Sequence, residues 1–160
     1  MKLLITGGTG YLGRALVAAA TARGFDPVVF ARTARSSGLA ARLIDGDIRD
    51  ADAVTAAAQG CDAICHTAAL VTIWRRRKQD FDDVNVGGLQ NVINAARREG
   101  IRRIVYTSSF LALPPSDSGR ATGTTISAPN SKRTRWLRTR SSTACPWCAC
   151  ILESSTDRDD

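Results

Sequence analysis

Three glycines near the start of the chain, Gly7, Gly10 and Gly13, are spaced so that they could cradle a phosphate. The pattern G-x-x-G-x-x-G is a spacing variant of the dinucleotide-binding motif. In that motif the first glycine permits a tight turn, the second lets the backbone approach a pyrophosphate, and the third lets a helix pack closely on a sheet. The following helix directs its free N–H groups at the anion. The alternative is a glycine-rich turn without a ligand.

A second candidate feature is the segment 30–35, which reads Phe-Ala-Arg-Thr-Ala-Arg and follows the second predicted strand. An acidic residue about 20 positions beyond the glycines would bind the 2′-hydroxyl of an NAD ribose. No acidic residue lies here, whereas Arg32 can pair with a 2′-phosphate. We therefore expect NADP as the cofactor in preference to NAD. Arg35 is equally well explained as a solvated residue at a helix start.

A third pattern, Cys145-Pro-Trp-Cys148, could bind a metal ion or exchange disulfides. A zinc site needs four ligands, and Cys150 with no nearby histidine leaves this one incomplete. A thioredoxin-like motif belongs at a strand-to-helix junction early in a fold, whereas this one lies in an aperiodic segment. We predict neither a metal site nor a redox site.

The elements that position these residues alternate between strand and helix. Short apolar runs predict strands, and amphipathic or Ala-rich runs predict helices. The expected strands are 2–6, 27–30, 41–44, 63–66 and 101–106, and the expected helices are 10–23, 50–60 and 81–98. This alternation predicts an α/β fold, a Rossmann-like doubly wound parallel sheet with the strand order 3-2-1-4-5. The ligand crevice of such a sheet lies at the carboxyl ends of its strands.

Length and composition exclude several classes of protein. The 160 residues suit one domain, and an apolar content of 44% with 13 glycines is typical of a globular chain. The apolar run after Met1 is too short for a signal peptide, and no run approaches the ~20 residues that cross a bilayer. We therefore expect a cytoplasmic protein with no membrane partner. The net charge of +7 leaves a nucleic acid or a phosphorylated ligand open, although a solvated arginine-rich surface explains it more simply.

Five stretches together resemble the extended short-chain dehydrogenase/reductase family, in particular its NAD-dependent epimerase/dehydratase and dihydroflavonol-reductase-like members. They are Thr6–Gly13, Gly46–Asp50, His66–Ala69, Val84–Gly88 and Val105–Ser109, in the family's order and spacing over residues 1 to about 113. Residues 71–74 and 109–113 look most like the subgroup of sugar epimerases and dihydroflavonol-type reductases. The resemblance implies an oxidoreductase or epimerase that uses NAD(P) and acts on a small-molecule carbonyl or a sugar nucleotide.

The resemblance also implies roles for residues in the matching motifs. Asp47 would hold the adenine through its carboxylate, and Ile48 would hold it by apolar packing. Ala68 and Ala69 would leave space beside the ribose and the nicotinamide, and Asn85 would order the active-site helix. Asp47 could alternatively cap the next helix. The cofactor-binding candidates are Gly7, Gly10, Tyr11, Leu12, Gly13, Arg32, Asp47, Ile48, Ala68 and Ala69.

Two further residues of the matching motifs are candidates for chemistry. Ser109 would be catalytic, because the resemblance implies that it hydrogen-bonds the substrate oxygen; its alternative is a turn residue. His66 is the only histidine. We predict that His66 is a strand-end residue with its hydrogen bonds satisfied, and not a general base.

The family's proton donor is missing from this sequence. In the family a Tyr-x-x-x-Lys pair supplies the acid/base group, and the lysine lowers the pKa of the tyrosine. Tyr11 and Tyr106 are the two tyrosines, and neither is followed four residues later by a lysine. The family's C-terminal substrate portion is also missing, so that the edge of the strand 101–106 would be exposed. We therefore expect a truncated, catalytically inactive dinucleotide-binding domain over residues 1–113.

Residues 114–160 are expected to form an irregular tail, because the periodicity disappears at Pro114. The residues from Thr143 onward can be back-translated into codons, and each codon can then be read from its third base. Read in this shifted frame, the codons permit the sequence Gly-Leu-Pro-Val-Val-Arg-Val-Tyr-Pro-Gly-Val-Val-Tyr-Gly-Pro-Gly. That sequence resembles a later segment of the family. We hypothesise that the tail is a shifted reading frame. The basic run 132–140 could instead be a nucleic-acid arm, with Trp136 stacking on bases. The frame hypothesis disfavours that alternative, and we expect no nucleic-acid partner.

Overall fold

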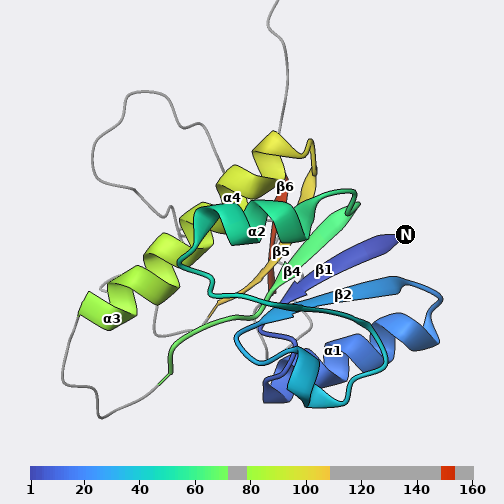
Figure 1. Ribbon diagram of the computed structural model, residues 1–160. Coiled ribbons are helices and arrows are strands. Elements are labelled where there is room, and N and C mark those ends of the chain that lie inside the picture. The colour runs from blue at the N-terminus through green and yellow to red at the C-terminus, as the bar shows by residue number, and fades with distance from the viewer. Residues whose placement is uncertain (72–78, 109–148, 154–160) are drawn as a thin grey trace, which may run out of the picture.

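The five predicted apolar runs form one parallel sheet in the computed structural model, which describes residues 1–71, 79–108 and 149–153 (Figure 1). They lie side by side in the order β3-β2-β1-β4-β5, so the predicted strand order is confirmed. The order reverses between β1 and β4, which is where sheets of this kind bind their ligands. The strands are β1 (Lys2–Thr6), β2 (Asp26–Ala31), β3 (Arg42–Asp45), β4 (Ala63–His66) and β5 (Arg103–Thr107).

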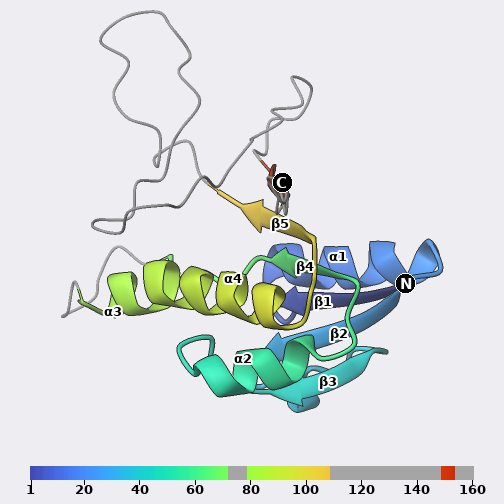
Figure 2. The ribbon, with the colours of Figure 1, turned by 90° about the horizontal axis from the view of Figure 1, so that it is seen from above.

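Helices cover both faces of this sheet (Figure 2). α1 lies on one face, and α2 and α4 lie together on the other. The doubly wound arrangement predicted from the sequence is therefore present. The helices are α1 (Tyr11–Ala22), the 3₁₀ turn η1 (Arg35–Ser37), α2 (Ala51–Ala58), the short α3 (Gln79–Phe81), the π-helical η2 (Asp82–Gly87) and α4 (Gly88–Arg98).

Alternating side chains of the buried strands build one core on each face. In β1, Leu4 packs toward α2 and α4 together with Val28 and Ile64. Its neighbour Ile5 points the other way and packs toward α1 with Val17. Each of these side chains is at most 3% exposed. Because burying one such side chain contributes about 2 kcal/mol, the two cores fix the sheet and hold its carboxyl edge in place.

The helix predicted over 81–98 is longer and less regular than expected. It begins at Gln79 and contains the π-helical stretch η2 ahead of α4. Gly88, at the start of α4, packs directly on Ile48, and a Cβ on this glycine would lie 2.9 Å from Cγ2 of Ile48. The close approach explains a glycine at a helical position, where it normally costs about 1 kcal/mol relative to alanine.

One segment of the predicted tail is a strand. β6 (Ala149–Glu153) pairs antiparallel with β5, with Ala149 opposite Thr107 and Glu153 opposite Arg103. The tail is therefore not irregular throughout. The expectation that the edge of β5 is exposed is wrong, because the backbone of β6 occupies it.

Several predicted features lie outside the described residues. These are Ser109, the boundary between residues 113 and 114, the basic run 132–140 and the segment Cys145–Cys148. Over the ranges that the structure does describe, no helix is both long and apolar enough to cross a membrane.

Candidate functional site

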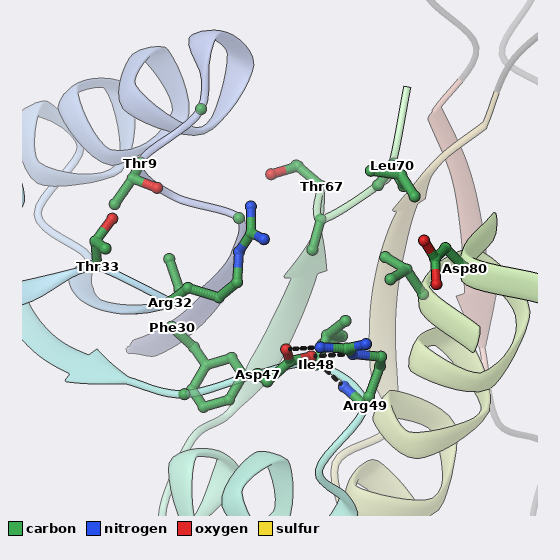
Figure 3. Close-up of a pocket in the computed structure, with 17 residues that line it drawn as sticks. Thr9, Phe30, Arg32, Thr33, Asp47, Ile48, Arg49, Thr67, Leu70 and Asp80 are labelled. Atoms are coloured by element: carbon green, nitrogen blue, oxygen red, sulfur yellow. Dashed lines mark hydrogen bonds and ion pairs between the residues drawn. The ribbon is translucent and has the colours of Figure 1, made fainter. Parts of the chain in front are cut away.

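An open cleft runs along the carboxyl edge of the sheet, between the glycine loop, the ends of β2, β3 and β4, and α3 (Figure 3). Its volume is about 280 Å³, close to the lower end of the ~300–1,000 Å³ range of ligand pockets. Most of the predicted cofactor contacts line it, namely Gly7, Gly10, Arg32, Asp47, Ile48, Ala68 and Ala69. It is also lined by polar residues that were not predicted, among them Thr9, Thr33, Arg49, Thr67 and Asp80.

Two glycines of the loop lie too close to neighbouring backbone to carry side chains. Gly7 has a φ of 72°, and its N–H donates to the carbonyl oxygen of Phe30 at 2.9 Å. A Cβ on Gly7 would lie 2.7 Å from the backbone nitrogen of Ala68. A Cβ on Gly13 would collide with the carbonyl oxygen of Gly7 and the backbone of Gly8. The first and third glycines therefore permit the tight turn and the close helix packing that the motif predicts.

The first turn of α1 begins at the cleft, because its N-cap residue Gly10 is part of the lining. This N-cap residue has no side chain that could cap the helix, and no acidic residue stands in the first turn. The N–H groups of Tyr11, Leu12 and Gly13 therefore lack intrahelical partners. These three residues do not themselves line the cleft, and the Tyr11 side chain is 98% exposed. An anion at this end of α1 would be bound by backbone N–H groups and by the helix dipole.

Arg32 follows β2 and extends its guanidinium into the cleft, between the glycine loop and Asp47 (Figure 3). It forms no ion pair with any residue of the described ranges. Arg35 differs: its guanidinium lies 3.9 Å from the Asp45 carboxylate, and its backbone N–H donates to the same carboxylate at 2.9 Å. Arg32 is therefore the arginine after β2 that is available to an anionic ligand.

Asp47 and Arg49, which follow β3, form a forked ion pair. Nε of Arg49 donates to Oδ1 of Asp47 at 3.0 Å, and an Nη donates to Oδ2 at 2.6 Å. The Arg49 backbone N–H adds a third bond to Oδ1 at 2.9 Å. The side-chain hydrogen bond from Arg49, more than any other cause, lowers the pKa of the Asp47 carboxyl from 3.8 to about 2. The alternative role of Asp47 as a helix cap is excluded, because Asp50 caps α2.

Apolar residues line the cleft beyond β4, and an amide outside the lining holds one of its segments. Ala68 and Ala69 line it together with Ile48, which is 7% exposed because it also packs in the core under α4. Asn85 of η2 accepts a hydrogen bond from the Leu70 N–H at 2.7 Å and donates to the Leu70 carbonyl at 3.2 Å. This pair of bonds ties the segment after β4 to η2, which is consistent with an ordering role for Asn85.

His66 ends β4 but is not part of the cleft lining. Its Nδ1 lies 2.7 Å from Oγ1 of Thr6, and its ring stacks on Tyr106 with centroids 5.6 Å apart. Burial lowers the pKa of the imidazole from 6.5 to about 4, so that the ring is neutral at pH 7. Within the described residues the predicted hydrogen bonding is met at Nδ1, whereas Nε2 is buried and has no hydrogen-bond partner there.

Comparison with known proteins identifies the family to which this fold belongs. The sequence model of the NAD dependent epimerase/dehydratase family matches residues 3–136. The chain belongs to this family. The match includes every residue that lines the cleft, and it continues past residue 113 into the segment that the sequence separates as a tail.

Individual proteins and solved structures are similar to most of this chain. Sterol demethylase protein B of Methylococcus capsulatus is 38% identical over 144 residues, which cover 88% of this chain and 44% of that protein. A short-chain dehydrogenase/reductase superfamily protein of Agrobacterium tumefaciens with bound NAD is 32% identical, with a TM-score of 0.62 over 68% of this chain and 33% of that chain. UDP-glucose-4-epimerase of Stenotrophomonas maltophila, with bound NAD and formylated UDP-arabinopyranose, is 27% identical, with a TM-score of 0.62 over 70% of this chain and 38% of that chain.

The chain spans between 31% and 44% of the length of the first curated relatives that it matches. It therefore corresponds to less than half of these family members.

Sequence reasoning missed two charged residues of this epimerase/dehydratase cleft, Asp80 and Arg49, and of these Arg49 pairs with a predicted site residue. The position of Arg49 two residues after Asp47, in the stretch Gly46–Asp50, was the available signal. Two side chains that are two residues apart in sequence can also point away from each other, so that only the structure shows the forked ion pair between Arg49 and Asp47. Ser109, the one catalytic candidate, lies outside the described residues.

Proposed function

We propose that this cleft binds NADP(H) and that the chain is the cofactor-binding part of an oxidoreductase or epimerase. The observation that carries the proposal is the uncapped start of α1, where Gly10 lies at the cleft and the next three N–H groups lack helical partners. A pyrophosphate at this position would accept hydrogen bonds from these groups. The bound NAD in two relatives supports a nicotinamide dinucleotide as the ligand.

The choice of NADP over NAD rests on Arg32. An acidic side chain after β2 would accept a hydrogen bond from the 2′-hydroxyl of NAD and would repel a 2′-phosphate. Here the position carries a guanidinium that extends into the cleft and has no ion-pair partner among the described residues. The nearby carboxylate of Asp47 is paired with Arg49, so it does not compete strongly for Arg32.

We further propose that this chain binds the cofactor without turning it over. Neither Tyr11 nor Tyr106 has a lysine four residues later, so the chain lacks the proton donor that the family resemblance implies. In an intact enzyme, Ser109 would hydrogen-bond the substrate oxygen beside such a pair. The substrate would be a small-molecule carbonyl or a sugar nucleotide, and the epimerase structure with bound formylated UDP-arabinopyranose is a precedent for the second.

Titration of the chain with NADPH and NADH, followed by nicotinamide fluorescence, tests the cofactor assignment. Wild type should bind NADPH about tenfold more tightly than NADH, because an arginine–phosphate ion pair contributes about 1.5–3 kcal/mol. Arg32→Ala should weaken NADPH binding to the level of NADH and leave NADH unchanged. Arg35→Ala is the matched control and should change neither.

Two outcomes would contradict the assignment. Equal affinity of wild type for NADPH and NADH, or an unchanged preference in Arg32→Ala, would contradict the choice of NADP. Binding of neither dinucleotide would contradict the proposed function as a whole.

A further inference from the structure

Arg14 of α1 joins two walls of the cleft that are separate in the sequence. Its Nε donates a hydrogen bond to the carbonyl oxygen of Thr9, in the glycine loop, at 3.1 Å. An Nη donates to the carbonyl oxygen of Ser37, at the end of the turn 32–37 that follows β2, at 3.3 Å. Thr9 and Arg32 line the cleft from these two segments (Figure 3). One guanidinium therefore bridges the loop after β1 and the turn after β2.

The bond to Thr9 fixes one peptide group of the glycine loop. The carbonyl of Thr9 and the N–H of Gly10 belong to the same planar trans peptide, so they point in opposite directions. The carbonyl accepts from Arg14, and the N–H donates to the carbonyl oxygen of Gly7 at 3.0 Å. Rotation of this peptide would break both bonds. Because Gly10 is the N-cap residue of α1, Arg14 helps to fix the point at which the proposed pyrophosphate site begins.

The bond to Ser37 holds the turn that carries Arg32. The Ser37 N–H donates to the carbonyl oxygen of Ala34 at 3.0 Å, which makes the turn compact. Ala34 is fully buried in the core that also contains Val17 of α1. The guanidinium of Arg14 is a planar fork with fixed donor directions, so it holds the two carbonyl oxygens at a set spacing. The turn is thus attached to α1 both by a buried methyl group and by this bridge.

We infer that Arg14 is a positioning residue that sets the spacing between the glycine loop and Arg32, so that the pyrophosphate and the 2′-phosphate of one NADPH molecule are bound at the same time. The inference rests on the proposed function, in which the start of α1 binds the first group and Arg32 binds the second. Covalent bonds limit the distance between these two groups of the ligand. A site whose two anchors already have this spacing loses less conformational freedom on binding. Arg14 itself does not line the cleft, so it acts through the two walls.

The ratio of the dissociation constants for NADH and NADPH tests this role, because the two ligands differ in the 2′-phosphate. Wild type should have a ratio of about ten, from the ion pair with Arg32, and Arg14→Ala should lower it to about three, as for the loss of one hydrogen-bonded bridge at an exposed site. Arg14→Lys keeps the charge but lacks the planar fork, so its ratio should also fall to about three. Adding Arg14→Ala to Arg32→Ala should leave the ratio near one, because Arg14 acts through Arg32.

Arg23→Ala is the matched control. It removes an exposed arginine at the other end of α1, whose side chain donates to the Ala19 carbonyl of the same helix at 3.4 Å. The overall charge changes as in Arg14→Ala, but no bridge to the cleft is lost, and the ratio should equal that of wild type. Circular dichroism spectra would verify that each variant is folded.

An unchanged ratio in Arg14→Ala overturns the inference and leaves the proposed function standing, because a residue that merely stabilises the loop would weaken the binding of both ligands equally. A wild-type ratio in Arg14→Lys, or a further fall of the ratio in the double variant, also overturns it, because the charge would then act on the phosphate directly. A ratio near one in wild type overturns the inference together with the choice of NADP. Binding of neither dinucleotide by wild type overturns the inference and the proposed function as a whole.

Discussion

The buried imidazole of His66 should make the folded state less stable as the pH falls below neutrality. The side chain is 1% exposed, and burial lowers its pKa from 6.5 to about 4. In the unfolded chain the same group titrates near its ordinary value of about 6.5. Between these two values the unfolded state binds a proton that the folded state does not, so that lowering the pH favours unfolding. The loss of stability therefore begins as the pH falls below about 6.5 and is complete below about 4.

The size of this effect follows from the two pKa values. The fall from 6.5 to about 4 corresponds to about 3 kcal/mol, at about 1.4 kcal/mol per pH unit. About 2 kcal/mol of this should be lost between pH 7 and pH 5. Asp47 does not contribute in that window, because its pKa moves from 3.8 to about 2 and its stabilising effect is lost only below about pH 4.

Urea unfolding at pH 7 and pH 5, on wild type and on His66→Gln, measures this contribution. Glutamine does not titrate, so the variant should lose about 2 kcal/mol less than wild type over the same pH range. Since His66 is the only histidine of the chain, an NMR titration of its ring protons also gives its pKa without further assignment. A pKa near 6.5 in the folded protein, or the same pH dependence in both proteins, would refute the reasoning.

Two further predictions concern the elements that frame the cleft. Asp50 accepts hydrogen bonds from the N–H groups of Asp52 and Ala53 at 3.0 Å. Asp50→Ala should therefore lower the free energy of unfolding, measured by urea denaturation, by about 1 kcal/mol. An unchanged free energy of unfolding would contradict the role of Asp50 as a helix cap. Gly13→Ala should displace α1 from the glycine loop and weaken NADPH binding about tenfold or more, whereas Ala15→Ser on the exposed side of α1 should leave it unchanged. Equal binding by the two α1 variants would show that the close packing at Gly13 does not matter.

The fold was largely predictable because its signals are local and repeated. Each buried strand is a short apolar run that ends at turn residues, and right-handed crossovers leave few possible orders for five parallel strands. The π-helical stretch Asp82–Gly87 was not predictable, because one wider turn barely changes the spacing of the apolar residues along the helix. β6 was not predictable either, since the pairing of Ala149–Glu153 with β5 depends on an edge that exists only in the folded sheet.

The site was predictable where the backbone constrains the residue type. Gly7 and Gly13 have to be glycines, because a Cβ at either would overlap the backbone of the neighbouring segment. For charged side chains, the backbone imposes no comparable constraint on the residue type. Arg35 and Arg49 each follow a strand and each pair with an aspartate, yet the partner is ten residues away in one case and two in the other. Which of them lines the cleft follows from the pairing of β2 with β3, and not from the local sequence.

The arrangement of the cleft would separate the proposed cofactor binding from the proposed chemistry. Every residue that lines it lies between Gly7 and Val84, on segments held by the strands β1 to β4 and by the helices that cover them. The candidate for substrate binding, Ser109, follows β5, and the Tyr-x-x-x-Lys pair of the family has no counterpart in the sequence. Because the lining depends on neither, the absence of the proton donor should abolish turnover while leaving the affinity for NADPH intact. A chain of this kind would hold the reduced cofactor without oxidising it.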